Sequence, residues 1–227
     1  MAYRMLAFDY DETLAVDGAI QPPAGEALAE AKAAGWRLAL VTGRPHEDLL
    51  ERCPLVGLFD VVVDENGAVL YLPAAGTVEE LVGRPDGRLR AELGRRGIPF
   101  FAGRIVTIVR RPHEADVVEI VRDGGLEVSL FHNRPAVMIV PRGTDKGTGF
   151  LEGLRRVGVA ADETIAVGDD ENDLAFLRLA GFRVAVANAI DAVKAEADVV
   201  TARPSGEGVA EFVRERVLGA PKSLRPR

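Results

Sequence analysis

Apolar runs of strand length alternate with helical stretches through most of the chain, and this alternation restricts the possible folds more than any other feature of the sequence. The apolar runs are short: residues 4–8, 37–41, 61–63, 68–72, 164–167, 182–185 and 198–201. Helical patterns lie between them: residues 23–34, 45–52, 146–157, 171–179 and 206–218. Strands that alternate with helices build a mostly parallel sheet with helices on both faces. The sequence therefore predicts an α/β fold with a Rossmann-like sheet.

A different pattern interrupts this alternation in the middle of the chain. Each helical stretch there is followed by two strand-like runs, which indicates an antiparallel sheet backed by two helices. We therefore expect an inserted α+β cap at residues 74–142 and a discontinuous core of residues 1–73 and 143–219. Residues 220–227 are typical of a flexible tail.

The composition indicates a globular protein and argues against several classes of function. Of the 227 residues, 48% are hydrophobic, which is enough for a sizeable core. The net charge of −7 argues against a nucleic-acid partner, because such a partner favours a basic surface. No apolar run approaches the roughly 18 residues of a membrane span, no signal-peptide pattern is present, and Cys53 is the only cysteine. We expect a cytoplasmic protein without membrane or nucleic-acid partners, and the sequence predicts no particular oligomeric state.

Polar side chains follow several predicted strands, at the edge where open α/β sheets bind ligands. Asp9 and Asp11 come directly after the first strand, and alternate residues of an extended chain face the same way. Paired carboxylates repel each other unless a cation or a shared proton separates their roles. On its own, this pair is more typical of a surface turn.

Two further strand ends carry groups that suit a phosphate. Thr42, Gly43 and Arg44 offer a hydroxyl and free backbone amides, although Thr42 taken alone is better explained as a helix cap. Lys146 opens the helix after the inserted segment, and it is one of four lysines in a chain with 24 arginines. A solvated lysine explains it equally well. The run is not a nucleotide-binding P-loop, because that motif places lysine after its second glycine, whereas Lys146 precedes Gly147.

A dense acidic cluster follows the strand at residues 164–167, where a helix is expected to begin. Acidic residues stabilise helix N-termini, but the four acids within residues 169–173 exceed what capping needs. Asp169 and Asp173 are four residues apart and therefore share one helix face. Carboxylate oxygens gathered in this way suit Mg²⁺.

Together, these groups resemble the motifs of the haloacid dehalogenase-like hydrolases, and the resemblance extends over nearly the whole chain. The matching residues are, in motif order, Asp9, Asp11 and Thr13; Thr42; Lys146; and Gly168-Asp169 with Asn172-Asp173. The inserted segment resembles the small type-II cap of the Cof-type branch. The runs Thr42-Gly43-Arg44 and Asn66-Gly67 are also similar to that branch.

The resemblance implies a Mg²⁺-dependent phosphatase that acts on a small phosphorylated metabolite, such as a sugar phosphate or phosphoglycolate. Asp9 would be the nucleophile and form an aspartyl-phosphate. Asp11 would protonate the leaving oxygen and then activate water. Mg²⁺ would be bound by the carboxylate of Asp9, the backbone carbonyl of Asp11 and the side chain of Asp169, with Asp173 as a further ligand or acting through water.

The resemblance also implies which residues contact the phosphate or the rest of the substrate: Thr42, Gly43, Arg44, Lys146 and Asn172. Lys146 would in addition keep Asp9 ionised, and Thr13 would brace the loop. Glu12 departs from the pattern, since many relatives have glycine there.

Two other functions stay open at this point. Phosphoryl transfer between sugar positions, as in related phosphomutases, is the main enzymatic alternative. A catalytically silent phosphate-binding module is the other, although such a module needs neither a nucleophile at Asp9 nor an acid at Asp11. A dehalogenase is less well supported, because it needs no cluster of Mg²⁺ ligands.

Overall fold

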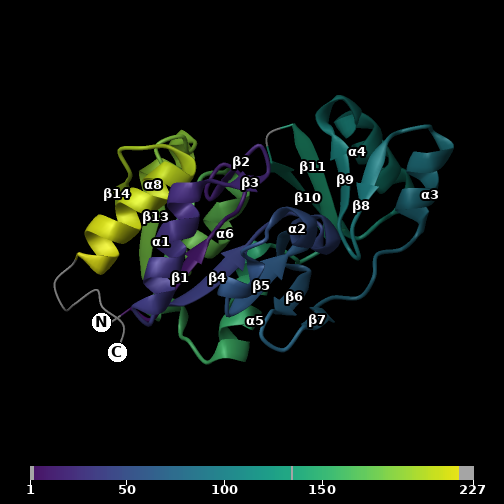
Figure 1. Cartoon of the computed structure of the whole chain (residues 1–227). Coiled ribbons are helices and arrows are strands. Elements are labelled where there is room, and N and C mark those ends of the chain that lie inside the picture. Colours follow the sequence, from purple (N-terminus) through teal and green to yellow (C-terminus); the bar gives the residue numbers. More distant parts are fainter. Residues whose placement is uncertain (1–2, 134, 220–227) are drawn as a thin grey trace.

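The computed structural model describes residues 3–133 and 135–219, which form two units of unequal size (Figure 1). The larger unit is built on an eight-stranded sheet. In spatial order its strands are β14 (Val199–Val200), β13 (Phe182–Ala185), β12 (Thr164–Gly168), β1 (Met5–Phe8), β4 (Arg37–Val41), β5 (Val61–Asp64), β6 (Val69–Leu72) and β7 (Thr77–Glu80). The strands from β14 to β5 run parallel, and β6 and β7 are antiparallel additions. The predicted α/β class with a mostly parallel sheet is confirmed.

The central strand β1 is completely buried, and its register determines where the functional side chains meet. Phe8, its last residue, pairs with Val167 of β12 and with Leu40 of β4. The backbone N–H of Asp9 then donates to the carbonyl of Val167 at 3.0 Å. The carboxyl ends of three parallel strands therefore lie at one edge of the sheet.

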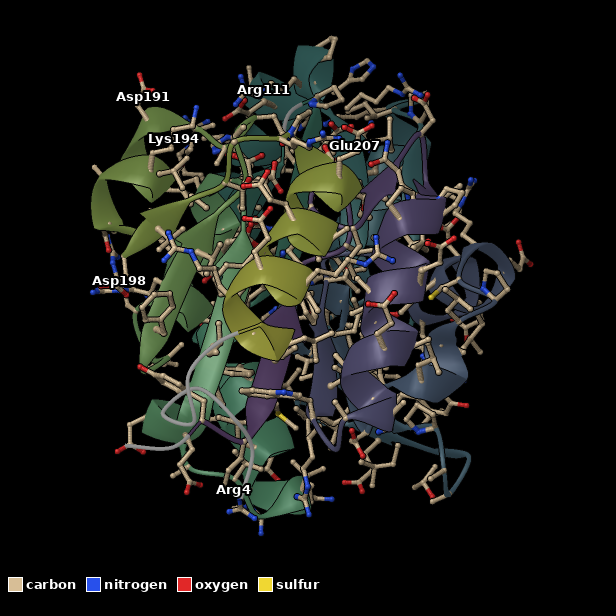
Figure 2. All side chains as sticks on the ribbon, turned by 60° about the vertical axis from the view of Figure 1, so that its left-hand side comes forward. Arg4, Arg111, Asp191, Lys194, Asp198 and Glu207 are labelled. Atoms are coloured by element: carbon tan, nitrogen blue, oxygen red, sulfur yellow. The ribbon has the colours of Figure 1, made fainter. Side chains whose placement is uncertain are left out.

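Helices cover both faces of this sheet, as the alternation of strand and helix predicts. They are α1 (Pro22–Ala33), α2 (His46–Arg52), α5 (Lys146–Val157), α6 (Leu174–Leu177), α7 (Asp191–Glu196) and α8 (Ser205–Phe212). Helices α1 and α8 lie side by side at the front of Figure 2, and α5 and α6 pack on the opposite face, where α5 contacts β5. In the same view Arg4, which precedes β1, lies at the bottom, and Arg111 of the smaller unit lies at the top. The carboxyl edge of the sheet therefore faces the smaller unit.

The smaller unit is a four-stranded antiparallel sheet with two helices on one face. Its elements are α3 (Arg88–Arg95), β8 (Phe100–Ala102), β9 (Thr107–Arg110), α4 (Glu114–Gly124), β10 (Val128–Asn133) and β11 (Ala136–Pro141). A hydrophobic cluster of its own joins the helices to this sheet. On the other face, Phe101, Ile108, Met138 and Phe131 form one row across the strands, because directly paired residues point to the same side. We call this face of the smaller sheet the roof.

The pairing of β7 (Thr77–Glu80) bears on the prediction that the inserted segment begins at residue 74. β7 pairs with β6 in the larger sheet, through contacts such as Leu70 with Glu79. The reason is that the chain turns at residues 73–76 and returns along β6 before it leaves the sheet. We therefore propose that the insertion begins after Glu80. The tail predicted at residues 220–227 lies outside the described residues.

Other departures are local and concern short elements. The helix predicted over residues 171–179 is a 3₁₀ turn followed by the single turn of α6, and the helix predicted over residues 206–218 ends in a π-helical segment, Val213–Leu218. A hairpin of β2 (Ala15–Val16) and β3 (Ala19–Ile20) is an additional element. Among the described residues, no helix combines the length and the apolar character that a bilayer crossing requires.

Gly67 provides a test of how tightly the turn after β5 packs against α5. Its φ is +98°, and a Cβ there would lie 1.9 Å from the carbonyl oxygen of Asp145, whereas Gly76 has a φ of +63° and open space around it. Both alanine substitutions suffer the left-handed backbone, but only Gly67→Ala also meets a steric clash. We expect Gly67→Ala to lower the free energy of unfolding in urea by roughly 1–3 kcal/mol more than Gly76→Ala, the usual cost of overpacking. Equal losses in the two variants would contradict this packing.

Candidate active site

The ammonium group of Lys146 lies buried between two carboxylates at the carboxyl end of β1. Its Nζ donates to Oδ1 of Asp9 at 2.5 Å and to Oδ1 of Asp173 at 2.6 Å. The lysine is the first residue of α5, where Asp145 is the N-cap. The side chain of Asp145 accepts from the N–H of Thr148 at 2.7 Å, and the Thr148 hydroxyl accepts from the N–H of Asp145 at 3.0 Å. This capping box fixes the start of the helix and thereby the position of the lysine.

Asp173 and Thr13 hold the loop that carries Asp169. Oδ2 of Asp173 accepts from the N–H of Asp169 at 2.8 Å and from that of Asp170 at 3.0 Å. The hydroxyl of Thr13 donates to Oδ1 of Asp169 at 2.8 Å. Both oxygens of Asp173 are therefore engaged within the protein, and Thr13 fixes the orientation of the Asp169 carboxylate.

Asp9, Asp169 and Asp173 form a buried carboxylate cluster, with one oxygen from each lying within 4.8 Å of the others. Lys146 contributes one positive charge against these three carboxylates, so the lysine alone does not balance them. Buried charges of one sign need further compensation. Hard oxygen donors at this spacing suit a divalent cation such as Mg²⁺. The residues present therefore fit the predicted metal.

The same crowding shifts the protonation equilibria of the cluster. Burial and the neighbouring carboxylates of Asp173 and Asp169 raise the pKa of Asp9 well above its usual range, although Lys146 acts in the opposite sense. Burial disfavours the ammonium form of Lys146, but the carboxylates of Asp173 and Asp9 outweigh it and raise the pKa of the lysine. An additional cation beside Asp9 would favour its ionised form.

Thr42 and Gly43 form a turn directly under the roof. Oγ1 of the buried Thr42 accepts from the N–H of Arg44 at 3.1 Å. A Cβ at Gly43 would lie 2.5 Å from Sδ of Met138, and 3.8 Å from Nδ2 of Asn172. A side chain at this position would therefore require Met138 to move, which shows how closely the roof approaches the turn. The structure brings the phosphate-binding residues predicted at positions 42, 43 and 172 into one neighbourhood.

Asn172 forms a buried pair with Asn66. Nδ2 of Asn172 donates to Oδ1 of Asn66 at 3.3 Å. Among the described residues, Nδ2 of Asn66 and Oδ1 of Asn172 find no partner. An unpaired buried polar group costs about 1–3 kcal/mol, and such groups are typical of a site that completes its hydrogen bonds with a ligand.

Asp11 lies apart from the carboxylate cluster and pairs with Arg44. The guanidinium donates from Nε to Oδ2 at 2.8 Å and from Nη2 to Oδ1 at 2.7 Å. Its Nη1 donates to Asp48 at 2.5 Å, and the group lies over the ring of Tyr10, 5.3 Å from the centroid. Arg44, predicted to contact substrate, is therefore already held by two carboxylates. The backbone carbonyl of Asp11 stays a predicted metal ligand, and the side chain of Asp11 is not part of the carboxylate cluster.

A cavity of about 670 Å³ lies between the larger unit and the roof. Asp11, Gly43 and Arg44 line it from one side, and Ile108 and Arg110 line it from the other. One wall is charged and the opposite wall is largely apolar. The cavity joins the carboxyl edge of the sheet to the smaller unit.

Sequence reasoning missed several residues that shape this site. Asp48 lies on α2, four residues after Arg44, which precedes the helix. This spacing predicts an ion pair if the side chain of Arg44 points toward the helix. The approach of Met138 to the turn at Thr42 and Gly43 carries no comparable signal, because it depends on how the smaller unit docks.

Comparisons with known proteins identify the family of the chain. The chain matches the haloacid dehalogenase-like hydrolase family over residues 6–80 and 119–213. It is 33% identical over 222 residues to a phosphoglycolate phosphatase of Methanothermobacter thermautotrophicus, covering 95% of this chain and 99% of the relative. It is also 33% identical over 224 residues to phosphoglycolate phosphatase 2 of Saccharolobus solfataricus, covering 95% of this chain and 93% of the relative.

Solved structures share the fold at lower sequence identity. A Thermoplasma acidophilum protein superposes with a TM-score of 0.81 at 20% identity, over 95% of this chain and 98% of the other. A sugar phosphatase of subclass IIB of the same superfamily superposes with a TM-score of 0.75 at 23% identity, over 93% of this chain and 98% of the other. These likenesses extend over both units of the structure.

The hydrogen bond from Thr13 to Asp169 can be tested through metal affinity. Thr13→Val removes the hydroxyl and keeps the branched shape, so Asp169 loses the group that orients it. We expect Mg²⁺ to bind roughly tenfold more weakly in this variant, the lower end of the effect of losing a supporting hydrogen bond at a metal site. Isothermal titration with Mg²⁺ measures this. Thr77→Val, on the exposed strand β7, is the control, and an equal loss in both variants would contradict the assignment.

Proposed function

The chain belongs to the haloacid dehalogenase-like hydrolases and is a phosphatase, and we propose that it hydrolyses a small phosphorylated metabolite with Mg²⁺ through an aspartyl-phosphate on Asp9. One observation carries the proposal. Carboxylates from the end of β1 and from the loop after β12 are buried together around the ammonium of Lys146. This arrangement combines a nucleophile with a cation-binding group in one enclosed place.

The first step of the proposed reaction is the attack of the Asp9 carboxylate on phosphorus. The new bond joins a carboxylate oxygen to phosphorus, and the bond from phosphorus to the ester oxygen breaks. Asp11 donates a proton to the departing oxygen, so that the leaving group is released as an alcohol. When bound, Mg²⁺ would neutralise negative charge on the phosphoryl group, held by Asp9 and Asp169 with Asp173 in support.

The second step returns the enzyme to its starting state. Asp11 accepts a proton from water as the water oxygen attacks phosphorus, and the bond between phosphorus and Asp9 breaks to release inorganic phosphate. Lys146, Thr42 and the amides of the turn at Gly43 would bind the phosphoryl oxygens throughout. Both oxygens of the Asp11 carboxylate accept from Arg44, so Arg44 fixes the direction of this carboxylate, and one of the two bonds must open before Asp11 carries the proton.

The proposed substrate is a short phosphorylated hydroxy acid of the phosphoglycolate kind. The names of the two relatives support this class. The cavity supports it as well, since Arg110 lines the side opposite Asp11, and no ion-pair partner of Arg110 lies within the part of the chain that the structure describes. Arg44 and Arg52, which line the same cavity, are already paired with acidic side chains. Arg110 is thus suited to bind a substrate carboxylate.

Replacement of the nucleophile tests the proposed mechanism directly. We expect Asp9→Asn to reduce phosphate release from 2-phosphoglycolate by roughly four orders of magnitude, as the loss of a covalent nucleophile does. The assay measures inorganic phosphate with Mg²⁺ and with EDTA, and Asp191→Asn on the exposed start of α7 is the matched control. Activity that survives Asp9→Asn, or persists in EDTA, would contradict the proposal. With a sugar phosphate as substrate, an isomeric sugar phosphate as product in place of free phosphate would indicate a mutase.

The role of Arg110 predicts a selective loss of affinity. Arg110→Gln should raise the KM for 2-phosphoglycolate roughly tenfold, the equivalent of one hydrogen bond to a charged group. The KM for glycerol 3-phosphate, whose leaving group is uncharged, should change little. Arg111→Gln removes the same charge one residue later, outside the cavity lining. An equal rise for both esters, or the same effect from Arg111→Gln, would refute this role.

A further inference from the structure

Glu65 is a fully buried acid at the turn between β5 and β6, with 0% of its side chain exposed. Its φ of +51° is left-handed, a conformation that non-glycine residues rarely adopt. The described residues place no basic side chain within ion-pair distance of its carboxylate. A buried carboxylate is costly unless hydrogen bonds replace its hydration, so its partners indicate what it does.

Those partners are backbone amides from both units. Oε1 accepts from the N–H of Arg104 at 2.9 Å and from that of His46 at 3.3 Å. Oε2 accepts from the N–H of Ile105 at 2.7 Å and from that of Val106 at 2.8 Å. Three successive amides of the smaller unit thus converge on one carboxylate of the larger unit, in the manner of a backbone anion nest.

The segment that binds Glu65 is adapted to this contact on both sides. A Cβ at Gly103 would lie 2.6 Å from Oε1 of Glu65, so the chain needs glycine to approach the carboxylate. From the other side, Nη2 of Arg90 donates to the carbonyls of Gly103, Ile105 and Val106 at 3.0, 3.2 and 3.0 Å. In residues 103–106, the carboxylate of Glu65 therefore accepts from the backbone amides, and the guanidinium of Arg90 donates to the backbone carbonyls.

The turn that carries Glu65 also contacts the turn at Thr42 and Gly43, which we propose binds phosphate and call the phosphate-binding turn. The N–H of Glu65 donates to the carbonyl of Arg44 at 3.0 Å, and the N–H of Asn66 donates to the carbonyl of Thr42 at 3.0 Å. Val106, at the end of the segment that binds Glu65, belongs to the small hydrophobic cluster of Met138. Met138 is the residue that lies against Gly43 in the roof.

We infer that Glu65 is a positioning residue that ties the smaller unit to the phosphate-binding turn and sets the height of the roof above the substrate. Its backbone holds the turn, and its side chain holds the segment that leads into β9. The kinetic part of this inference rests on the proposed function, whereas the structural part does not. Loss of the carboxylate should loosen the roof without removing any group that contacts the phosphoryl group.

Glu65→Gln is the sharpest test, because it keeps the size and replaces one acceptor oxygen by an NH₂ group that faces amide donors. We expect amide hydrogen exchange at residues 104–106 to become roughly tenfold faster, the fold-change that one lost hydrogen bond to a charged group corresponds to. Exchange in β1 and β12 should not change. The KM for 2-phosphoglycolate should rise by a similar factor, while the inhibition constant of inorganic phosphate, which has no leaving group to contact the roof, stays within about twofold.

Glu47→Gln is the matched control, because Glu47 also contacts Arg104. This contact is an exposed ion pair between Oε1 of Glu47 and Nε of Arg104 at 2.8 Å. Such a pair contributes little, so exchange and KM should stay at the wild-type values. Unchanged exchange at residues 104–106 in Glu65→Gln, or the same change in Glu47→Gln, would overturn the inference.

Gly103→Ala provides a second route if Glu65→Gln does not fold. The added methyl group forces the segment away from the carboxylate, and Gly83→Ala, with open space around it, is its control. We expect faster amide exchange at residues 104–106 in Gly103→Ala and not in Gly83→Ala, and unchanged exchange in Gly103→Ala would contradict the inference. If the wild-type protein hydrolyses no phosphate ester, the proposed function fails, and the exchange measurement still decides the inference about Glu65.

Discussion

The buried ammonium of Lys146 is the interaction on which the rest of the site depends. A charge removed from water without a partner costs several kcal/mol, so the fold must bring carboxylates to this lysine. Asp9 comes from the end of β1, and Asp173 comes from the turn after β12, more than 160 residues later in the chain. The parallel register of the two strands makes this meeting possible, and the cap of α5 places the lysine between them. The excess of carboxylates over this single ammonium then makes the place suitable for a divalent cation.

The two units have separate hydrophobic clusters, and specific contacts align one with the other. Apolar packing within each unit explains why each is folded, but it does not determine their relative position. That position is fixed at the joint, where the carboxylate of Glu65 binds the smaller unit, Met138 lies above Gly43, and Ile105 packs against Ala68 and Val69. Hydrogen bonds are directional, so a buried carboxylate is better suited than an apolar contact to fix an orientation. The cavity between the two units follows from this alignment.

Much of the core and of the site could be predicted from the sequence, because local patterns carry both. Local features of the sequence include the apolar runs of β4 and β13 and the capped start of α5. The acids after β12 could be assigned to the site because open α/β sheets bind ligands beyond the carboxyl ends of their strands. What the sequence could not predict depends on distant segments. The pairing of β7 with β6 extends the larger sheet through a short strand with two glutamates, a composition that hardly suggests a strand. The partners of Glu65 lie about 40 residues away, and no spacing rule connects them.

The larger sheet is built from two chain segments that the smaller unit separates in sequence, and this has a consequence for how the chain folds. Met5 of β1 pairs with Thr164 of β12, so this pairing can form only after the intervening chain has been synthesised and has folded back. Contacts so distant in sequence slow folding, because the entropy of the loop is lost before the contact forms. The smaller unit reduces this loss, since its hairpins and helices are local in sequence and bring the two ends of the loop near each other. On the ribosome, we expect the smaller unit to become compact before β1 and β12 pair. It would then hold the two chain segments of the larger sheet close together until that pairing forms.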